Sequence, residues 1–562
     1  MIFGYVFIIL FSLLTFGGVA PGATAGIEGF IFTLFFLYLL RGTREGRVQI
    51  VPSPLNLAAV LFFCLIIYQL TGLPHSSIYR YATRVDFLKY LAYYLFFFLV
   101  ANTLKTKREI YRLLLSVLVL VVALSFWGVA EKMADIHHVG AGPFINENHY
   151  ANWLAMAIIF TFGLFLATGH VSPRSPRKDE SDSPRWKNVL LLLDTPRPLL
   201  FMLVIFSSVG LFFSLSRGGI SSFAVGFLFL GFLLMFHREF RGNALLIPAL
   251  SLCLFSILFW MGADSIARKM FTIKEISLSS DQRILVWQST LKIFRDFPII
   301  GSGLGTFASI FPAYRSEAII PKIFSFAHNE YLQLLSEVGI VGFLIFFAGF
   351  VVFFFRIIQQ SIMRHDHTAV ALTSAGVAGL CAGFVHALVD FPFRIPANGL
   401  LLALILGMVT ITSQGRFSRD GSITLRFRTV TIHKKGIFRG LLILGYIFLL
   451  GVAIRPALAE YVARKDVLAA LRFEPGNGRF SYLAGQSYLK SPEALSQEQA
   501  LPHLLRAVRL DPYNAKYRQS LGWLYANLGY RDRAEEELRL AVRMDPTNPV
   551  RLQAYRNWFP GE

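Results

Sequence analysis

Long apolar runs separated by short charged segments dominate the first 455 residues of the chain. A helix needs about 20 predominantly apolar residues to cross a bilayer. Thirteen runs meet this requirement: 2–20, 24–40, 55–72, 87–103, 111–130, 150–168, 198–215, 219–236, 244–262, 338–356, 368–389, 396–413 and 437–455. This pattern predicts an all-α, polytopic membrane domain over residues 1–455 with about 13 transmembrane helices.

The longest polar interruption, residues 262–337, is predicted to be a structured loop. Within it, residues 281–297 are predicted to form a helix, because four apolar side chains recur at helical spacing. These are Ile284, Trp287, Leu291 and Phe294. Pro298 ends the helix, and the glycine-rich run 301–305 predicts a turn. The run lacks the Gly-Lys-Ser/Thr ending of a nucleotide-binding loop.

The remaining residues, 456–562, contain an internal repeat. The sequence of Ala507–Pro512 recurs at Ala541–Pro546, 34 residues later, and a weaker copy lies at Ala470–Pro475. Thirty-four residues is the tetratricopeptide period. The small, aromatic and apolar positions of that pattern are also present: Gly485, Tyr488, Ala500, Leu504, Leu521, Gly522, Tyr525, Ala534 and Leu538. We predict a helical repeat domain of the tetratricopeptide type.

Such repeats usually present a concave face to a partner, so an envelope protein is the expected partner of this domain. The alternative is a set of helical hairpins that only pack on the membrane domain. Because a domain with its own core can be detached, we expect the membrane fold and its chemistry to survive removal of the repeats.

Composition and charge narrow the class of protein. Hydrophobic residues make up 55% of the chain and charged residues only 16%, whereas soluble proteins have about 25% charged residues. An ordinary soluble enzyme and a disordered chain are therefore excluded. The net charge is +20, but no contiguous basic face with interleaved aromatics occurs, so no nucleic-acid partner is expected. Cys64, Cys253 and Cys381 each lie in an apolar run, which argues against a disulfide framework.

The basic residues fix an orientation. They gather in alternate loops, at 41–47, 105–108, 174–187, 237–241, 356–364 and 416–435. All six loops are cytoplasmic if the N-terminus is cytoplasmic. With 13 spans, the long loop and the repeat domain then lie on the periplasmic side of a bacterial inner membrane. One span more or fewer after residue 400 would instead place the repeats in the cytoplasm.

Two arginines are candidate anion-binding residues. Arg217 interrupts an apolar stretch, and a guanidinium at membrane depth costs about 2.5–3.5 kcal/mol on insertion scales. Either a bound anion or a salt bridge to another helix must compensate. Its neighbours Ser216, Gly218 and Gly219 allow close approach of a ligand or backbone. Arg283 begins the predicted loop helix, where a helix N-terminus favours anions, although a solvated arginine is the alternative.

His328 is the candidate proton acceptor, because imidazole titrates near neutral pH and the residue lies where the long loop meets the tenth span. Asn329 and Glu330 follow it directly. The alternative is an interfacial histidine bonded to backbone.

Two further polar groups are expected to line or brace the same cavity. Asn146 and His149 lie at the outer mouth of the sixth span, and His386 and Asp390 are spaced i, i+4 on one helix face. No third and fourth ligand are apparent, so no metal site is predicted.

Several of these motifs together resemble the O-antigen ligase family of bacterial membrane glycosyltransferases. They are Ser216-Arg217-Gly218-Gly219, Arg283 with residues 301–307, His328–Gln333 with Gly339–Gly342, and Phe144–His149. The resemblance covers roughly residues 1–413, with its core at 198–355. The added thirteenth span and the repeat domain depart from the family pattern.

The resemblance implies transfer of a glycan from an undecaprenyl-diphosphate carrier to lipid A–core, to another glycan chain or to protein. It implies that Arg217 and Arg283 bind the diphosphate, that His328 assists the acceptor, and that neither metal nor nucleotide is needed as a cofactor. Two other functions remain open from the residues alone: a non-enzymatic scaffold for polysaccharide assembly, and a transporter. The spans show no repeated halves of the kind transporters have.

Overall fold

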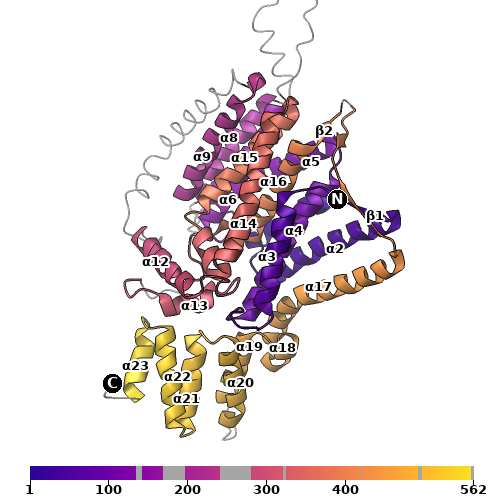
Figure 1. The fold of residues 1–562 in the computed structure, drawn as a ribbon. Coiled ribbons are helices and arrows are strands. Elements are labelled where there is room, and N and C mark those ends of the chain that lie inside the picture. The colour runs from indigo at the N-terminus through magenta and orange to yellow at the C-terminus, as the bar shows by residue number, and fades with distance from the viewer. Residues whose placement is uncertain are drawn as a thin grey trace, which may run out of the picture.

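The computed structural model of the chain is predominantly helical (Figure 1). It describes residues 1–134, 142–168, 197–240, 280–319, 324–418, 420–490 and 496–558. The predicted span at 244–262, Cys253 and the basic loop at 174–187 lie outside these residues.

Nine helices in the described part of the chain are long and apolar enough to cross a membrane. They are α2 (Pro21–Glu45), α4 (Arg80–Thr103), α5 (Lys107–Met133), α6 (Glu147–Ala167), α9 (Arg217–Met235), α14 (Glu330–Ile362), α15 (His367–His386), α16 (Pro396–Gln414) and α17 (Lys435–Ala463). Three shorter apolar helices accompany them: α1 (Ile2–Leu14), α3 (Pro54–Leu70) and α8 (Arg197–Phe213). The chain is therefore a multi-pass membrane protein, and each of the 12 predicted spans that falls in described residues coincides with one helix. The count of 13 spans stays a prediction.

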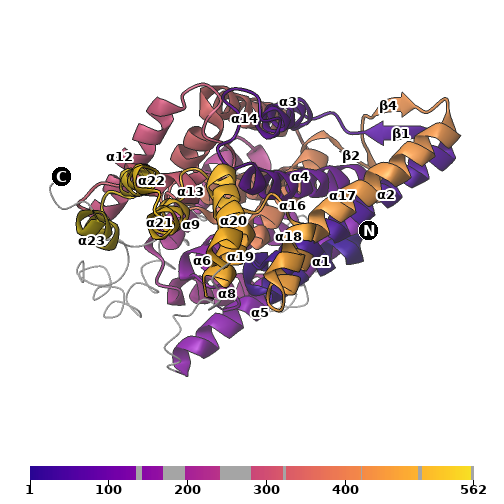
Figure 2. The same cartoon turned by 90° about the horizontal axis from the view of Figure 1, so that it is seen from below.

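Helices α6, α15 and α16 form the centre of the bundle, and α17 lies at its edge. Almost every side chain of α6 and α16 is buried, whereas α17 exposes most of its apolar side chains. Small residues make the central packing possible: Gly379 lies against the backbone of α6 at Met156. Helix α17 packs along α2, and this pair projects from the bundle (Figure 2).

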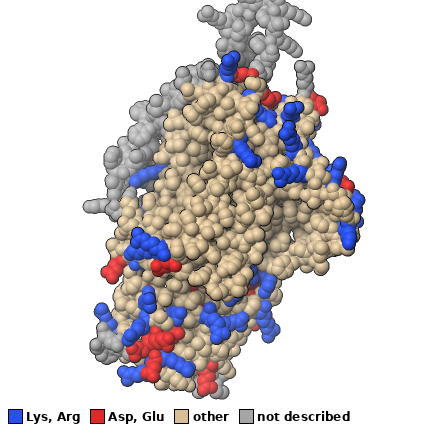
Figure 3. All heavy atoms as spheres, viewed as in Figure 1, with Lys and Arg blue, Asp and Glu red and all other residues tan. Residues whose placement is uncertain are grey.

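The basic loops meet at one end of the bundle. Strand β1 (Arg47–Ile50) pairs antiparallel with β4 (Arg428–Thr431), and β2 (Arg416–Phe417) pairs with β3 (Ile423–Thr424). The 105–108 loop joins them through the Lys107 amide, which donates to the Gly421 carbonyl at 2.8 Å. These short strands were not predicted. On the face in Figure 3, a broad uncharged band separates this basic end from the mixed charges at the other end.

The opposite end carries α12 (Ser280–Asp296) and α13 (Phe307–Tyr314) (Figure 1). The predicted loop helix is present, but its apolar spacing does not mark its buried face. Val286 and Ile293 are fully buried, whereas Ile284 and Leu291 are exposed. Apolar spacing cannot distinguish a face that packs on protein from one that lies against the membrane interface.

The glycine-rich run forms a strap against a kink in α14. Gly339 has a φ of 62°, which interrupts the helix, and Gly301 lies so close that a Cβ would be 2.4 Å from the Glu337 carbonyl oxygen. The amides of Ser302 and Gly303 donate to the Ser336 and Glu337 carbonyls at 3.0 and 2.9 Å. The strap thus satisfies carbonyls that the kink frees, and it fixes the first turns of α14.

The C-terminal residues form further helices: α18 (Val467–Phe473), α19 (Gly478–Leu489), α20 (Ser496–Leu510), α21 (Ala515–Asn527), α22 (Arg531–Met544) and α23 (Pro549–Trp558). Helix α19 packs on α20, and α21 packs on α22. Gly485 lies against Leu504 in the first pair and Gly522 against Leu538 in the second, so equivalent positions make equivalent contacts. The assignment of this domain to the tetratricopeptide type stays a prediction.

Candidate functional site

His328 directly precedes α14, at the end of the bundle opposite the basic loops. Asn329 caps this helix, since its side-chain oxygen accepts the Leu332 amide at 3.0 Å. The backbone of His328 is left-handed, with a φ of 52°. Such a conformation costs a non-glycine residue about 1–3 kcal/mol and is concentrated at functional sites. Trp287 of α12 donates to the His328 carbonyl at 3.4 Å, which ties this strained turn to the loop helix.

Asp390 holds the imidazole of His328. The His328 Nδ1 and Asp390 Oδ1 atoms lie 3.2 Å apart, and His386 Nε2 lies 3.9 Å from the other carboxylate oxygen. Burial alone would raise the pKa of Asp390, but the imidazoles of His328, His386 and His149 hold that pKa well below its ordinary value. An ionised carboxylate at Nδ1 orients the ring and leaves Nε2 to exchange a proton with a substrate.

Arg217 begins α9 beside this pair. The Ser216 hydroxyl caps the helix by accepting the Gly219 amide at 3.2 Å, and it donates to Asn148 at 2.6 Å. Gly218 faces His386, because a Cβ there would be 3.4 Å from the imidazole Cε1. The Arg217 side chain is exposed at the helix start. The break between α8 and α9 therefore spares the guanidinium the full cost of burial at membrane depth.

Arg283 lies in the first helical turns of α12, one turn before Trp287. The two residues are spaced i, i+4 and so share a helix face. The Arg283 side chain is half-buried, and its Nε has no hydrogen-bond partner within the described residues. A buried guanidinium N–H without a partner is a donor available to an anion.

Phe391 contacts two of the predicted histidines. The rings of His149 and His328 contact Phe391 edge-on, with centroids 4.8 and 4.9 Å away. The His149 carbonyl accepts Asn398 Nδ2 at 3.1 Å, and Asn146 caps α6 by accepting the Asn148 amide at 2.7 Å. The structure thus brings α6, α9, α14 and the turn after α15 together at one site.

Residues 202–347 match the family model described as O-antigen ligase. This segment contains Arg217, Arg283 and His328. Over that segment the chain is similar to the O-antigen ligase family. A comparison with curated proteins finds no match. Asn146, His149, His386 and Asp390 contribute to the same site from outside that segment.

A buried ionic network links the family segment to η2 (Pro392–Arg394), and sequence reasoning missed its central residue. Arg394 is almost fully buried; its Nη2 donates to Glu337 at 2.8 Å and its Nη1 to Asp86 at 3.3 Å. Glu330 lies 3.3 Å from its Nε. Glu330 and Glu337 therefore contact Arg394, and Asp390 is the carboxylate beside His328. The available signal was an arginine in a short link on the outer side, against the positive-inside trend.

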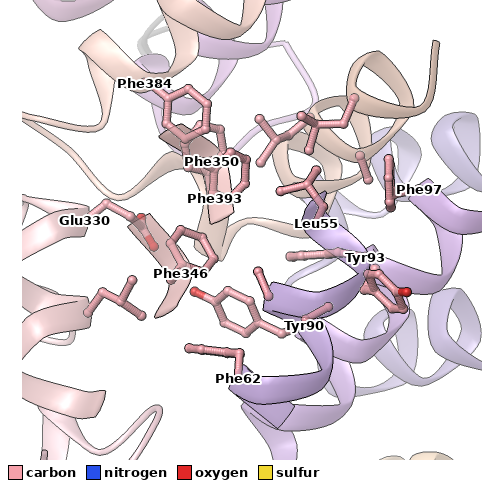
Figure 4. Close-up of a pocket in the computed structure, with 18 of the residues that line it drawn as sticks. Leu55, Phe62, Tyr90, Tyr93, Phe97, Glu330, Phe346, Phe350, Phe384 and Phe393 are labelled. Carbon is pink, nitrogen blue, oxygen red and sulfur yellow. The ribbon is translucent and has the colours of Figure 1, made fainter. Parts of the chain in front are cut away.

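An apolar pocket opens beside this network (Figure 4). It has about 1040 Å³ of empty space, part of it open to the surroundings, between α3, α4, α14 and α16. Aromatic rings dominate its lining, which includes Phe62, Tyr90, Tyr93, Phe97, Phe346, Phe350, Phe384 and Phe393. The carboxylate of Glu330, inside the family segment, points toward it (Figure 4). Among the described residues, no three His, Cys, Asp or Glu side chains are placed to hold a metal ion.

Proposed function

We propose that this protein transfers a glycan from an undecaprenyl-diphosphate carrier to a hydroxyl acceptor at the outer face of the inner membrane. The observation that carries the proposal is the His328–Asp390 pair, which lies at the start of α14 beside the helix that Arg217 begins. The O-antigen ligase family match over residues 202–347, which include Arg217 and His328, supports the class of reaction.

The proposed mechanism divides the work among three functional side chains, His328, Arg217 and Arg283, with Asp390 as the partner of His328. His328 accepts the proton of the acceptor hydroxyl at Nε2 while Asp390 stabilises the imidazolium. The acceptor oxygen forms a bond to the anomeric carbon, and the bond from that carbon to the phosphate oxygen breaks. Arg217 and Arg283 stabilise the negative charge that develops on the departing diphosphate. Attack from the face opposite the leaving group inverts the anomeric carbon.

The aromatic pocket suits the lipid part of the donor. A polyprenyl chain is entirely apolar, and the pocket offers almost only apolar side chains between four membrane helices. Its position beside Glu330, two residues after His328, would bring the first isoprene units close to the site of transfer. We therefore assign the lipid end of the carrier to this pocket.

The orientation follows from the basic end of the bundle. Five of the six predicted basic loops fall wholly or partly in described residues. Contacts in or next to these loops bring them to the same end of the bundle: β1 with β4, Lys107 with Gly421, Arg364 with Gly415, and Phe240 with His367. By the positive-inside rule this end is cytoplasmic. The site, the long loop and the tetratricopeptide-type domain, residues 456–562, are then periplasmic.

Replacement of His328 by asparagine tests the proposal. Asparagine tolerates the left-handed backbone of this position but cannot act as a base near neutral pH. We expect His328→Asn to lower transfer by about 10²–10⁴-fold at normal protein level. Full transfer by this variant would contradict the assignment and favour a scaffold.

Glycan analysis of a deletion strain complemented with each variant supplies the measurement and the acceptor class. Lipid-linked repeat units that accumulate without long chains identify a polymerase. Long chains that are made but not attached to lipid A–core identify a ligase, and loss of glycan from protein identifies a protein O-oligosaccharyltransferase. The proposal fails if the deletion changes none of these products.

A further inference from the structure

Each unit of the C-terminal repeat turns a corner with an acidic residue, a proline and, two residues later, an asparagine. These acid–proline corners are Glu474–Asn477, Asp511–Asn514 and Asp545–Asn548. The acidic residue of all three corners is buried and reaches a side chain of the membrane domain or its long loop.

The first corner binds the start of α4. Glu474 has no exposed surface and forms an ion pair with Arg84. The Tyr79 hydroxyl accepts the Gly478 amide at 3.2 Å and donates to Asn477 at 3.4 Å. Backbone and side chain are therefore both held at this corner.

The second and third corners bind α13 and the residue that follows it. The Ser309 hydroxyl donates to Asp511 at 3.3 Å. Arg315 donates to Asp545 at 2.6 Å through Nη2 and to Thr547 at 2.7 Å through Nε. The Arg315 side chain is only 7% exposed and that of Asp545 10% exposed, so water screens this ion pair weakly.

An apolar contact continues from the second corner toward the site. Tyr513 packs against the apolar cluster that α12 and α13 form with the residues before α14. That cluster contains Val286, three residues after Arg283, and Ala327, which directly precedes His328. The docked repeats thus brace the elements that carry two of the three proposed functional side chains.

We propose that the docked repeat domain positions the loop helix α12 and the His328 turn for transfer, with Arg315 and Tyr513 as positioning residues. This inference rests on the proposed function. It replaces the expectation that the repeats are a detachable module. The described part of the long loop has a small apolar core, so contacts from the repeat domain contribute directly to its order.

Hydrogen exchange and donor kinetics on the full-length protein in detergent test the two parts separately. We expect Arg315→Gln to speed amide exchange in α13 by about tenfold or more, because it leaves a carboxylate of the third corner without its cross-domain partner. The apparent KM for the lipid-linked donor should rise by a similar factor while kcat changes less. Arg315→Lys, which keeps the charge, should restore much of both.

A double-mutant cycle and a matched control complete the design. Asp545→Asn combined with Arg315→Gln should change exchange and donor KM by less than the two single changes together, since both remove the contact of Arg315 with Asp545. Asp545→Asn also removes the ion pair with Arg551 of α23, within the repeats. Arg539→Gln removes an exposed ion pair on α22 and should change neither readout. Additive effects would show that the two residues act independently and would refute docking through this pair.

Tyr513→Ala supplies a second route to the same test. We expect this variant to remain folded and membrane-inserted, and to have a higher KM for the lipid-linked donor. Faster exchange in α13 without any change in KM or kcat, for Arg315→Gln and Tyr513→Ala alike, would overturn the positioning role. If the wild-type protein itself shows no transfer, the proposed function fails, and exchange alone still decides whether the corners hold the loop.

Discussion

The side chains of this site obtain their geometry from helix starts. His328, Arg217 and Asn146 each lie at the first residue of a helix or just before it, where unpaired amide groups favour negative charge. Leu215 and His328, which precede α9 and α14, both have left-handed backbones. Two such residues beside one proposed diphosphate site indicate that turns into helices, rather than helix interiors, present the reactive groups.

A substitution at Arg217 tests whether use of the lipid-linked donor requires the planar guanidinium or only a positive charge. Arg217→Lys keeps the positive charge but loses the planar fork that grips two phosphate oxygens. We expect kcat/KM for the lipid-linked donor to fall by about tenfold or more, since a lysine ammonium cannot form the two parallel bonds that a guanidinium makes to two phosphate oxygens. Steady-state kinetics in detergent provide the measurement. Wild-type kinetics would remove Arg217 from the mechanism.

Asp511 gives the docked repeats a pH dependence. Burial raises its pKa to about 6, although bonds from Asn514 and Ser309 lower it, and Tyr79 and Tyr517 also face it. Because the folded-state pKa lies above the unfolded value, the stability from Asp511 is full at acidic pH and is lost as pH rises through 6.

Asp511→Asn should therefore stabilise the protein at pH 7.5, by up to about 3 kcal/mol, and much less at pH 4. The difference in thermal unfolding midpoint between variant and wild type, measured at both pH values, checks this. A loss of stability that is larger at pH 7.5 than at pH 4 would mean that the docked state uses the ionised carboxylate.

At the level of elements, the strap and the α14 kink form one unit. Gly301 has a φ of 81° and lies against the backbone of Glu337 and Val338. Gly301→Ala should lower the unfolding midpoint, because a left-handed alanine costs about 1–2 kcal/mol before any clash is counted.

Gly445→Ala is the matched control for this prediction. Gly445 lies in the middle of α17, and a Cβ added there would have no other atom within 4 Å, so alanine should be neutral or slightly stabilising. The structural role of the strap is wrong if both variants unfold at the wild-type midpoint.

Sequence patterns predicted where the helices lie better than they predicted what each element packs against. Hydropathy located the described spans because each span needs its own apolar run. Gly339, the residue at the kink of α14, lies beside the predicted start of the tenth span. The spacing did not show which side chains of α12 are buried, because Ile284 and Leu291 follow the helical period and are nevertheless exposed. Strands β1 to β4 were missed because two to four residues carry too little alternation to mark a strand, and β1 and β4 are in addition nearly 400 residues apart.

For the whole molecule, the dependence of contacts on packing explains which residues of the candidate site could be predicted from the sequence. Arg217 and His328 were conspicuous because polar groups are rare between apolar runs. That Asp390, rather than Glu330, would meet His328 depends on how α14 and the turn after α15 pack, which one sequence does not contain. Arg394 was overlooked because its significance comes from Glu337 and Asp86, distant in the chain and brought together only by folding.

Topology is the whole-molecule prediction with the simplest measurement. Because the basic loops gather at one end and the repeats at the other, a periplasm-dependent phosphatase fused after residue 562 should be active. A fusion in the 416–435 loop, at the basic end, should be inactive and serves as the control. The reverse pair of results would place the proposed site on the cytoplasmic side.

The three acid–proline corners also limit how the number of repeats can change during evolution. Repeat arrays commonly grow or shrink by duplication, because each unit contacts only its neighbours. Here Glu474, Asp511 and Asp545 meet three different positions of the membrane domain and its loop, so the spacing of the units is matched to a fixed surface. A unit duplicated between two corners would shift every later corner away from its partner. A duplicated unit leaves all three contacts in place only if it follows α23. We therefore expect natural variation in repeat number to be confined to that end.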